Sequence, residues 1–288
     1  TSCVITQPGK IDELLAENGL LQCKPSYIPG IPNVLISSRD SPSPDDTEHI
    51  AFMADKPYKR RVGQLLHIAR TSRPDICYQV NALARVNHNP GKLHWEASTH
   101  LLRYISHTRE YGLVLKQADT GLQLRMWSDA TWAPDYGTYY DNHRSTTGWT
   151  ASGNNDGSNL LSWCSHRQST IALSSCESET NAAVDAAQEA VYVRGLLADL
   201  NVPLPHRVPM SCDNQSAIKL SLSVSDARQS RHVGNKAAFI RQQVRNGHLT
   251  LEWVPSADEI ADCQTKCLPL PQHELLRTRM GVLHRSSI

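Results

Sequence analysis

The sequence lacks any long run of apolar residues. A membrane-spanning helix needs roughly 18 or more consecutive apolar residues, and no stretch of the 288 residues approaches that length. The first thirty residues also lack a charged segment followed by an apolar run, which a secretory signal would have. We therefore expect a chain without a membrane span. The chain begins with Thr1 rather than Met, which we interpret as a processed start or as the start of a piece of a longer protein.

The cysteines lack a repeated spacing. They stand at positions 3, 23, 77, 164, 176, 212, 263 and 267, which is neither a disulfide framework nor a pair of zinc knuckles. We therefore expect reduced thiols in an intracellular compartment. One close pair, Cys263 and Cys267, could share a helix face and hold a metal together with His273. The alternative interpretation is two half-buried core thiols.

The net charge is only +1, but it is unevenly distributed. Residues 56–116 carry eleven Lys or Arg against three Asp or Glu, whereas residues 1–55 carry three against eight. A basic segment of this kind predicts either a surface for a polyanion or a solvated helical surface. The candidate contacts to a nucleic-acid backbone are Lys59, Arg60, Arg61, Arg70, Arg73 and Arg103, together with Arg144 from a later polar turn.

Apolar periodicity and loop composition divide the chain into four parts. Residues 1–55 combine a short helix at 11–17 with a Pro/Ser-rich linker from about position 24 to 55. Residues 56–118 show three apolar stripes at helical spacing, which predict a small helical unit. Residues 119–270 predict the main domain, and residues 271–288 a C-terminal tail.

The main domain shows strand patterns followed by alternating helices and strands. Strands are predicted at 122–128, 146–151, 160–163, 208–212 and 249–254, and helices at 175–200, 215–222, 236–245 and from about 258 to 269. The first three strands follow one another through turns and are expected to be antiparallel. This order predicts an α/β fold with a mixed five-stranded sheet and helices on its faces.

Four acids stand where this order places strand ends or helix starts. Asp129 ends the first strand, Glu179 lies in the first turn of the long helix, Asp213 follows the fourth strand and Asp262 lies in the last predicted helix. Strand ends on one edge of a sheet converge on a common crevice. Carboxylates that converge there repel one another unless cations lie between them. Oxygen ligands favour Mg²⁺ or Mn²⁺, and two such ions suit phosphodiester hydrolysis.

The phrases around these acids carry a family resemblance. They are Tyr58-Lys-Arg-Arg-Val-Gly-Gln-Leu-Leu-His, Ser72-Arg-Pro-Asp-Ile, Asn89-Pro-Gly-Lys-Leu-His-Trp-Glu-Ala, Leu102-Arg-Tyr-Ile, Arg144-Ser-Thr-Thr-Gly, Ser162-Trp, Ala172-Leu-Ser-Ser-Cys-Glu-Ser-Glu, Cys212-Asp-Asn-Gln-Ser-Ala and Ala261-Asp-Cys-Gln-Thr-Lys. In this order they resemble the C-terminal part of the polyprotein of copia-type LTR retrotransposons, which is the end of reverse transcriptase followed by ribonuclease H.

The resemblance implies a ribonuclease H-like fold preceded by a helical unit like the thumb and connection of a reverse transcriptase. It implies Asp129, Glu179, Asp213 and Asp262 as catalytic metal ligands, with two Mg²⁺ or Mn²⁺ ions if the site is active. The implied partners are an RNA/DNA hybrid and an upstream reverse transcriptase core, without which the chain cannot polymerise. The implied location is intracellular, cytoplasmic or nuclear for a retroelement and organellar if the chain is domesticated and processed.

Three functional hypotheses stay open at this point. The first is an endonuclease that cleaves the RNA of RNA/DNA hybrids. The second is a domesticated, non-catalytic subunit of a larger multi-protein assembly, because the chain has Thr131 and Thr180 where the family commonly has an acid and an aromatic residue. The third is integrase or transposase activity on a related fold. Glu177 is the alternative to Glu179 as a ligand, although the family pattern places the ligand second.

Overall fold

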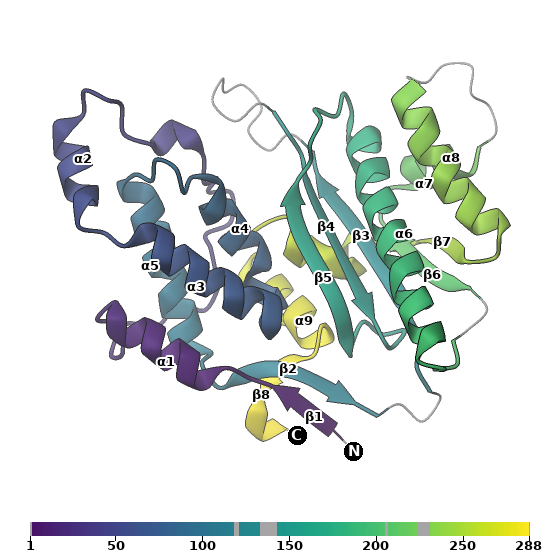
Figure 1. The fold of residues 1–288 in the computed structure, drawn as a ribbon, viewed down its shortest axis with the longest axis horizontal. Helices are drawn as coiled ribbons and strands as arrows, with labels where there is room; N and C mark the ends of the chain where they lie inside the picture. The colour runs from purple at the N-terminus through teal and green to yellow at the C-terminus, as the bar shows by residue number, and fades with distance from the viewer. Residues whose placement is uncertain (1, 118–120, 133–142, 205–206, 224–230, 288) are drawn as a thin grey trace.

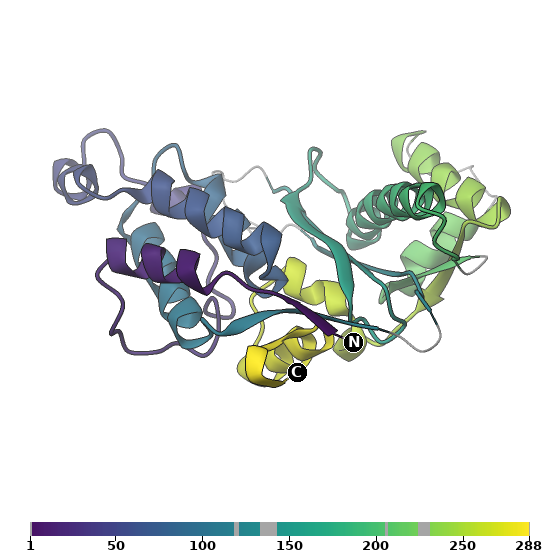
Figure 2. The ribbon, with the colours of Figure 1, turned by 60° about the horizontal axis from the view of Figure 1, so that its bottom comes forward.

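The computed structural model describes residues 2–117, 121–132, 143–204, 207–223 and 231–287, with main chain only for 231–233. A helical unit, a small sheet and a larger sheet with its own helices make up this part of the chain (Figure 1). The helical unit and the larger sheet lie side by side, and both chain ends reach the small sheet (Figures 1 and 2).

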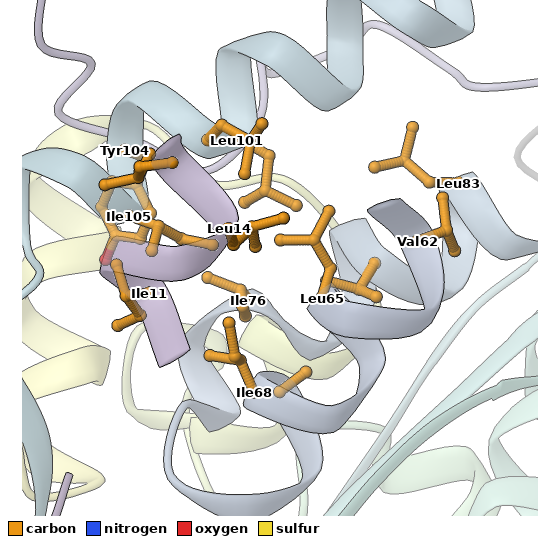
Figure 3. Close-up of a cluster of buried hydrophobic side chains, with 14 of the residues drawn as sticks. Ile11, Leu14, Val62, Leu65, Ile68, Ile76, Leu83, Leu101, Tyr104 and Ile105 are labelled. Atoms are coloured by element: carbon orange, nitrogen blue, oxygen red, sulfur yellow. The ribbon is translucent and has the colours of Figure 1, made fainter. Parts of the chain in front are cut away.

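The helical unit is held together by one apolar core. Its main helices are α1 (Pro8–Glu17), α3 (Tyr58–Thr71), α4 (Cys77–Arg85) and α5 (Lys92–His107). Each helix turns its apolar stripe inward, and Ile11, Leu65, Leu83 and Leu101 meet there without exposure to solvent (Figure 3). The three apolar stripes predicted for residues 56–118 are therefore confirmed as packed helices.

The segment predicted as a linker contains a helix that its composition does not reveal. Helix α2 (Thr47–Ala54) begins after Asp46, whose side chain accepts a hydrogen bond from the His49 N–H at 3.0 Å. None of its residues is buried, so it has no apolar stripe to signal a helix. The prediction of a continuous loop is wrong here, and a short 3₁₀ turn, η1 (Ser38–Asp40), interrupts the same segment.

The small sheet joins the two ends of the chain to its middle. Strand β2 (Tyr111–Lys116) pairs antiparallel with β1 (Ser2–Ile5) on one side and with β8 (Val282–His284) on the other. Helix α9 (Leu270–Arg279) leads into β8. Periodicity within the C-terminal tail does not predict these elements, because such short strands are stabilised by partners far away in the sequence.

The larger sheet has the strand order β5-β4-β3-β6-β7. The strands are β3 (Arg125–Thr131), β4 (Thr146–Ser152), β5 (Leu160–Arg167), β6 (Val208–Cys212) and β7 (Leu249–Trp253). The pairs β3–β4 and β4–β5 are antiparallel, whereas β3–β6 and β6–β7 are parallel. The predicted α/β fold with a mixed five-stranded sheet is confirmed, and its topology is ribonuclease H-like.

Helices cover both faces of this sheet. Helices α6 (Ser175–Asp199), α7 (Gln215–Leu222) and α8 (Arg231–Arg245) gather on one side (Figure 1). On β3, Met126 points into the core beneath α6, and its neighbour Trp127 points into a second core that includes Leu276 of α9. Alternate residues of a strand face opposite sides, so Asp129 shares the side of Trp127. No helix in the described part of the chain is long and apolar enough to cross a membrane.

The last predicted helix is instead two short 3₁₀ turns. These are η3 (Ser256–Asp258) and η4 (Ile260–Gln264), and η4 lies directly against β4. A Cβ on Gly148 would come within 2.6 Å of the Gln264 Cβ and the Thr265 Cγ2, so only glycine allows this approach. The prediction of a regular helix from 258 to 269 is wrong, because close packing against the sheet selects the tighter turns that bring Asp262 to β3.

A buried carboxylate cluster as the candidate functional site

Four elements bring the four predicted acids to one place. Asp129 lies on β3, Glu179 on α6, Asp213 directly after β6 and Asp262 on η4. Asp129, Glu179 and Asp262 are only 2%, 6% and 5% exposed, and Asp213 is half-buried. Glu179 is the fifth residue of α6 and so lies just past the first turn, in which it was predicted. We describe the cluster as two pairs: Glu179 and Asp213, whose ligand atoms lie within 4.8 Å of each other, and Asp129 and Asp262, which both contact Lys266.

In the first pair, the Glu179 and Asp213 carboxylates lie close together and have little compensating positive charge. One ligand atom each from Glu179, Cys212 and Asp213 lies within 4.8 Å of the other two. The Ala130 N–H donates to the Glu179 carboxylate, but the buried Oε2 of Glu179 has no hydrogen-bond partner among the described residues. Burial, followed by the charges of Asp129 and Asp213, raises the pKa of Glu179 to about 10. This carboxylate therefore lacks a counter-charge.

In the second pair, a hydroxyl group and an ammonium group of the chain contact the Asp129 and Asp262 carboxylates. The Thr265 hydroxyl donates to Oδ2 of Asp129, and the Lys266 ammonium lies 2.8 Å from Oδ1 of Asp262 and 3.8 Å from Oδ2 of Asp129. Burial and the charge of Asp129 raise the pKa of Asp262 to about 7, although Lys266 opposes the shift. The charge of Asp129 thus acts on both Glu179 and Asp262 and couples the two pairs.

Neighbouring groups hold Asp213 in its orientation. The Ser256 hydroxyl donates to Oδ2 of Asp213 at 2.7 Å, and the Trp253 indole N–H donates to its main-chain carbonyl at 3.0 Å. The next residue, Asn214, caps α7 by accepting from the Ala217 N–H at 3.0 Å. The strand end and the helix start together therefore fix where this carboxylate points.

Glu177, the alternative candidate ligand, forms hydrogen bonds at the start of α6 and does not belong to the cluster. Its carboxylate accepts a hydrogen bond from the Leu173 N–H at 2.9 Å, and its own N–H donates to the Ser174 hydroxyl at 3.1 Å. These reciprocal bonds form a cap at the start of α6. Glu179, two residues further along α6, lies in the carboxylate cluster instead.

The donor set fits a hard divalent cation. An opposite charge favours the ionised form of a carboxylate, so a cation beside Glu179 would reverse the effect of its burial. Carboxylate oxygens suit Mg²⁺ or Mn²⁺ rather than softer metals. Cys212 is a poor competitor, because burial and the nearby Glu179 raise the pKa of its thiol and keep it protonated at neutral pH.

Three further residues beside the carboxylate cluster were not predicted from the sequence. Glu259 is fully buried, and its Oε1 accepts from the Ala261 N–H at 3.0 Å while its Oε2 has no hydrogen-bond partner among the described residues. Burial and the charge of Asp129 raise the pKa of Glu259 well above its usual range. Thr265 and Lys266 are the other two, and the spacing of four residues between Asp262 and Lys266 was the available signal.

The alternative metal site at Cys263, Cys267 and His273 is not formed. The Cys267 thiol donates to Oε1 of Gln79 at 2.9 Å, and Nε2 of His273 lies 3.0 Å from the Tyr104 hydroxyl. Cys263 is buried in the core beneath the sheet. Both thiols thus serve packing, as the alternative interpretation held.

Two of the predicted nucleic-acid contacts are buried. Arg61 lies over the Trp95 ring, 3.3 Å from its centroid, and donates to Ser98 at 2.7 Å. Arg73 is fully buried and forms an ion pair with Asp75 at 2.7 Å. The prediction that these two guanidinium groups grip a duplex is wrong, because a count of charges does not reveal which side chains face inward.

The other basic residues face solvent. Lys59, Arg60, Arg70, Arg103 and Arg144 are exposed, and Arg60 forms an ion pair with Glu17 at 2.6 Å. Their role in binding nucleic acid stays a prediction.

Comparison with known proteins relates almost the whole chain to retroelement polyproteins. It is 32% identical over 272 residues to the retrovirus-related Pol polyprotein from transposon RE2 of Arabidopsis thaliana, which covers 94% of this chain and 17% of the relative. It is 30% identical over 280 residues to the corresponding polyprotein from transposon TNT 1-94 of Nicotiana tabacum, which covers 96% of this chain and 20% of the relative. The chain thus spans about a fifth of the length of these curated relatives. No protein-family model matches it.

Solved structures with a similar fold include the N-terminal RNase H domain of Rv2228c from Mycobacterium tuberculosis, solved as a fusion with maltose-binding protein. It is 12% identical, with a TM-score of 0.37, over 55% of this chain and 97% of that chain.

Proposed function

The chain belongs to the family of copia-type retrovirus-related Pol polyproteins and contains a ribonuclease H-like domain, and from this premise we propose that it cleaves the RNA strand of RNA/DNA hybrids. The reaction is phosphodiester hydrolysis that depends on divalent metal ions. One observation carries the proposal: the buried carboxylate cluster leaves Oε2 of Glu179 without a partner at the strand ends of the sheet. Buried carboxylates normally have partners, so an unneutralised group in a cluster points to a ligand.

Each acid has a role in this proposal. Asp129, Glu179 and Asp213 would hold one divalent ion, and Asp129 and Asp262 would be ligands for a second. When bound, such ions activate water and stabilise the leaving oxygen of a phosphodiester. The chain itself fixes the ligands in advance, because Ser256 and Thr265 donate to the Asp213 and Asp129 carboxylates.

The substrate follows from the fold and the exposed charge. A hybrid duplex is recognised by groove shape and 2′-hydroxyl groups rather than by base edges. Exposed residues of the helical unit, Lys59, Arg70 and Arg103, supply contacts to phosphates. An upstream reverse transcriptase core is the partner that would deliver the hybrid in a polyprotein.

The direct test is cleavage of a hybrid with a labelled RNA strand. Wild-type protein is expected to cut the RNA in Mg²⁺ or Mn²⁺ and to leave 3′-hydroxyl ends, and a chelator is expected to stop the reaction. Asp213→Asn should abolish most of the activity while the thermal unfolding midpoint stays the same, because the shape of the side chain is conserved. Unchanged cleavage by this variant would contradict the proposal.

A second candidate function is a non-catalytic subunit of a larger assembly. Tyr192, Leu196 and Leu200 of α6 and its C-terminus are 65%, 46% and 63% exposed and recur every four residues, so they form an apolar stripe on the outer surface. Folded protein that neither cleaves hybrids nor binds Mn²⁺ would favour this alternative.

A further inference from the structure

The two halves of the carboxylate cluster differ in how their charge is balanced. On the side of Glu179 and Asp213, the buried Oε2 of Glu179 has no hydrogen-bond partner among the described residues. On the side of Asp129 and Asp262, an ammonium group is already in contact with both carboxylates. Among the described residues, neither carboxylate of the first half forms an ion pair, whereas both carboxylates of the second half contact one ammonium group.

Lys266 is built into this position. Its main-chain N–H donates to the Asp262 carbonyl at 3.2 Å, which fixes the turn that follows η4. From this turn the ammonium reaches Oδ1 of Asp262 at 2.8 Å and Oδ2 of Asp129 at 3.8 Å. The same Oδ2 atom of Asp129 also accepts a hydrogen bond from the Thr265 hydroxyl. Two neighbouring residues of one turn, Thr265 and Lys266, thus bring a hydroxyl group and a positive charge to this half of the cluster.

We propose that Lys266 is the fixed cation of the Asp129–Asp262 pair, so that the substrate-free chain binds one divalent ion tightly, at Asp129, Glu179 and Asp213. The proposal rests on the metal-dependent function proposed above and deepens it. A second ion at Asp129 and Asp262 would share both carboxylates with the ammonium, and like charges at such short range repel strongly. Lys266 therefore sets how many ions the site takes.

The second ion can enter only when the ammonium withdraws. The Lys266 side chain is 41% exposed, whereas those of Asp129 and Asp262 are 3% and 7% exposed. The lysine thus lies at the boundary between the buried carboxylates and solvent. A substrate phosphate, which is an anion, is the chemical group that would draw it away.

The test is calorimetric titration of the metal-free chain of residues 1–288 with Mn²⁺ alone. Wild-type protein is expected to show one tight site and a second site at least tenfold weaker. Lys266→Gln should bind two ions with affinities that differ by less than tenfold, and Lys266→Arg, which keeps the charge, should behave as wild type. Lys236→Gln is the matched control, because Lys236 is likewise a lysine with a buried polar partner, donating to the Asn181 side chain at 2.8 Å, but it contacts no carboxylate of the cluster. It should leave the stoichiometry unchanged.

Two results would overturn the role of Lys266. The first is a wild-type chain that binds two ions with similar affinity. The second is a folded Lys266→Gln variant whose second ion binds no more tightly than in wild type. If the Gln variant fails to unfold cooperatively on heating, Lys266→Met, which keeps the length of the side chain without its charge, provides the same comparison.

Hybrid cleavage by the same samples separates this inference from the proposed function. If wild type cleaves RNA but binds two ions equally, the nuclease stands and the role of Lys266 fails. If Lys266→Gln gains an ion but the wild type does not cleave, the role of Lys266 stands and the nuclease fails.

Discussion

Buried charged groups occur in two regions of this molecule. In one region the chain supplies the opposite charge, and in the other it does not. In the helical unit, the Arg73 guanidinium contacts the Asp75 carboxylate and donates to the Thr108 carbonyl at 3.0 Å, and the Tyr104 hydroxyl donates to Asp75 at 2.7 Å. Burial alone would raise the pKa of Asp75, but Arg73 lowers it to about 2. At the sheet, burial and like charges raise the pKa of Glu179 to about 10.

The difference separates a structural ion pair from a binding site. The Arg73 guanidinium, the Asp75 carboxylate and the Tyr104 hydroxyl are partners of one another and of Thr108, so this network fastens η2 (Pro74–Ile76) to α5. The Glu179 side of the cluster is incomplete, and an incomplete buried carboxylate is costly unless something binds to it. Buried charge that the chain does not neutralise is therefore the more informative sign of function.

Asp129→Asn and Asp75→Asn should separate the two regions most strongly. Asp129→Asn is expected to lower the rate of hybrid cleavage at least about a hundredfold, because even groups that only support metal ligands are worth about 10–100-fold. Asp75→Asn should leave the rate per folded molecule unchanged. Steady-state cleavage, corrected for the folded fraction by circular dichroism, measures both. Equal losses in the two variants would contradict the distinction.

The free energy of unfolding should fall more in Asp75→Asn than in Asp129→Asn, which is the reverse of the order expected for the cleavage rate. Asp75→Asn leaves the Arg73 charge buried without its counter-charge, which is expected to cost about 3 kcal/mol. Asp258→Asn is the control, because its ion pair with Arg279 is exposed and should contribute less than about 1 kcal/mol. Urea denaturation of the three proteins measures the difference. A cost below that of the control would show that Arg73 is not fixed by Asp75.

The pH dependence of stability should also differ between the regions. In metal-free protein the folded state keeps a proton on Glu179 that the unfolded state has lost above its ordinary pKa, so stability falls as pH rises from about 5 to 9, by at most about 1.4 kcal/mol per pH unit for one proton. The lowered pKa of Asp75 acts oppositely, and its contribution is lost only as pH falls from about 4 to 2.

Urea denaturation at several pH values in the presence of a chelator measures the slope. Glu179→Gln should reduce the slope between pH 5 and 9 by the contribution of one proton and leave the part that comes from Asp262 and Glu259, and Mn²⁺ should reduce it in wild type. A slope that is the same in wild type and Glu179→Gln would show that Glu179 is ionised in the folded chain without any cation.

The smallest expected effect concerns exposed charge. Lys59→Ala together with Arg70→Ala should flatten the log–log dependence of hybrid affinity on salt by about one to two units, because each exposed cation releases about one counterion from the duplex. Lys10→Ala is the control, since Lys10 is paired with Glu13 on the acidic N-terminal segment and should not change the slope. An unchanged slope in the double variant would remove the helical unit from the hybrid-binding surface.

Local sequence patterns predicted the helices and strands that have a buried apolar face along their length. The long helix was expected at 175–200 and is found at Ser175–Asp199, and the strand at 208–212 was predicted to the residue. Strand β8, α2 and η4 were not predicted, because they have short or exposed faces and depend on contacts from distant segments. Local periodicity carries no information about such contacts.

The same limit applies to the candidate site. Strand ends and a helix start were enough to assemble Asp129, Glu179 and Asp213, because these positions follow from the order of the elements. The spacing of Asp262 and Lys266 was a signal for a contact between these two residues, but the contact of Lys266 with Asp129 could not be predicted, because it depends on the turn after η4. The burial of Arg73 could not be predicted either, because it depends on how the short connection between α3 and η2 packs against Thr108 at the end of α5.

The central claim is that Asp129, Glu179 and Asp213 form an incomplete site that a divalent ion completes. Crystals of the chain soaked in Mn²⁺ and measured for anomalous scattering test it most directly. The account predicts one strong anomalous peak bounded by these three carboxylates, with the Lys266 ammonium still in contact with Asp262. A map with full-occupancy Mn²⁺ elsewhere on the protein and none between these carboxylates would contradict it.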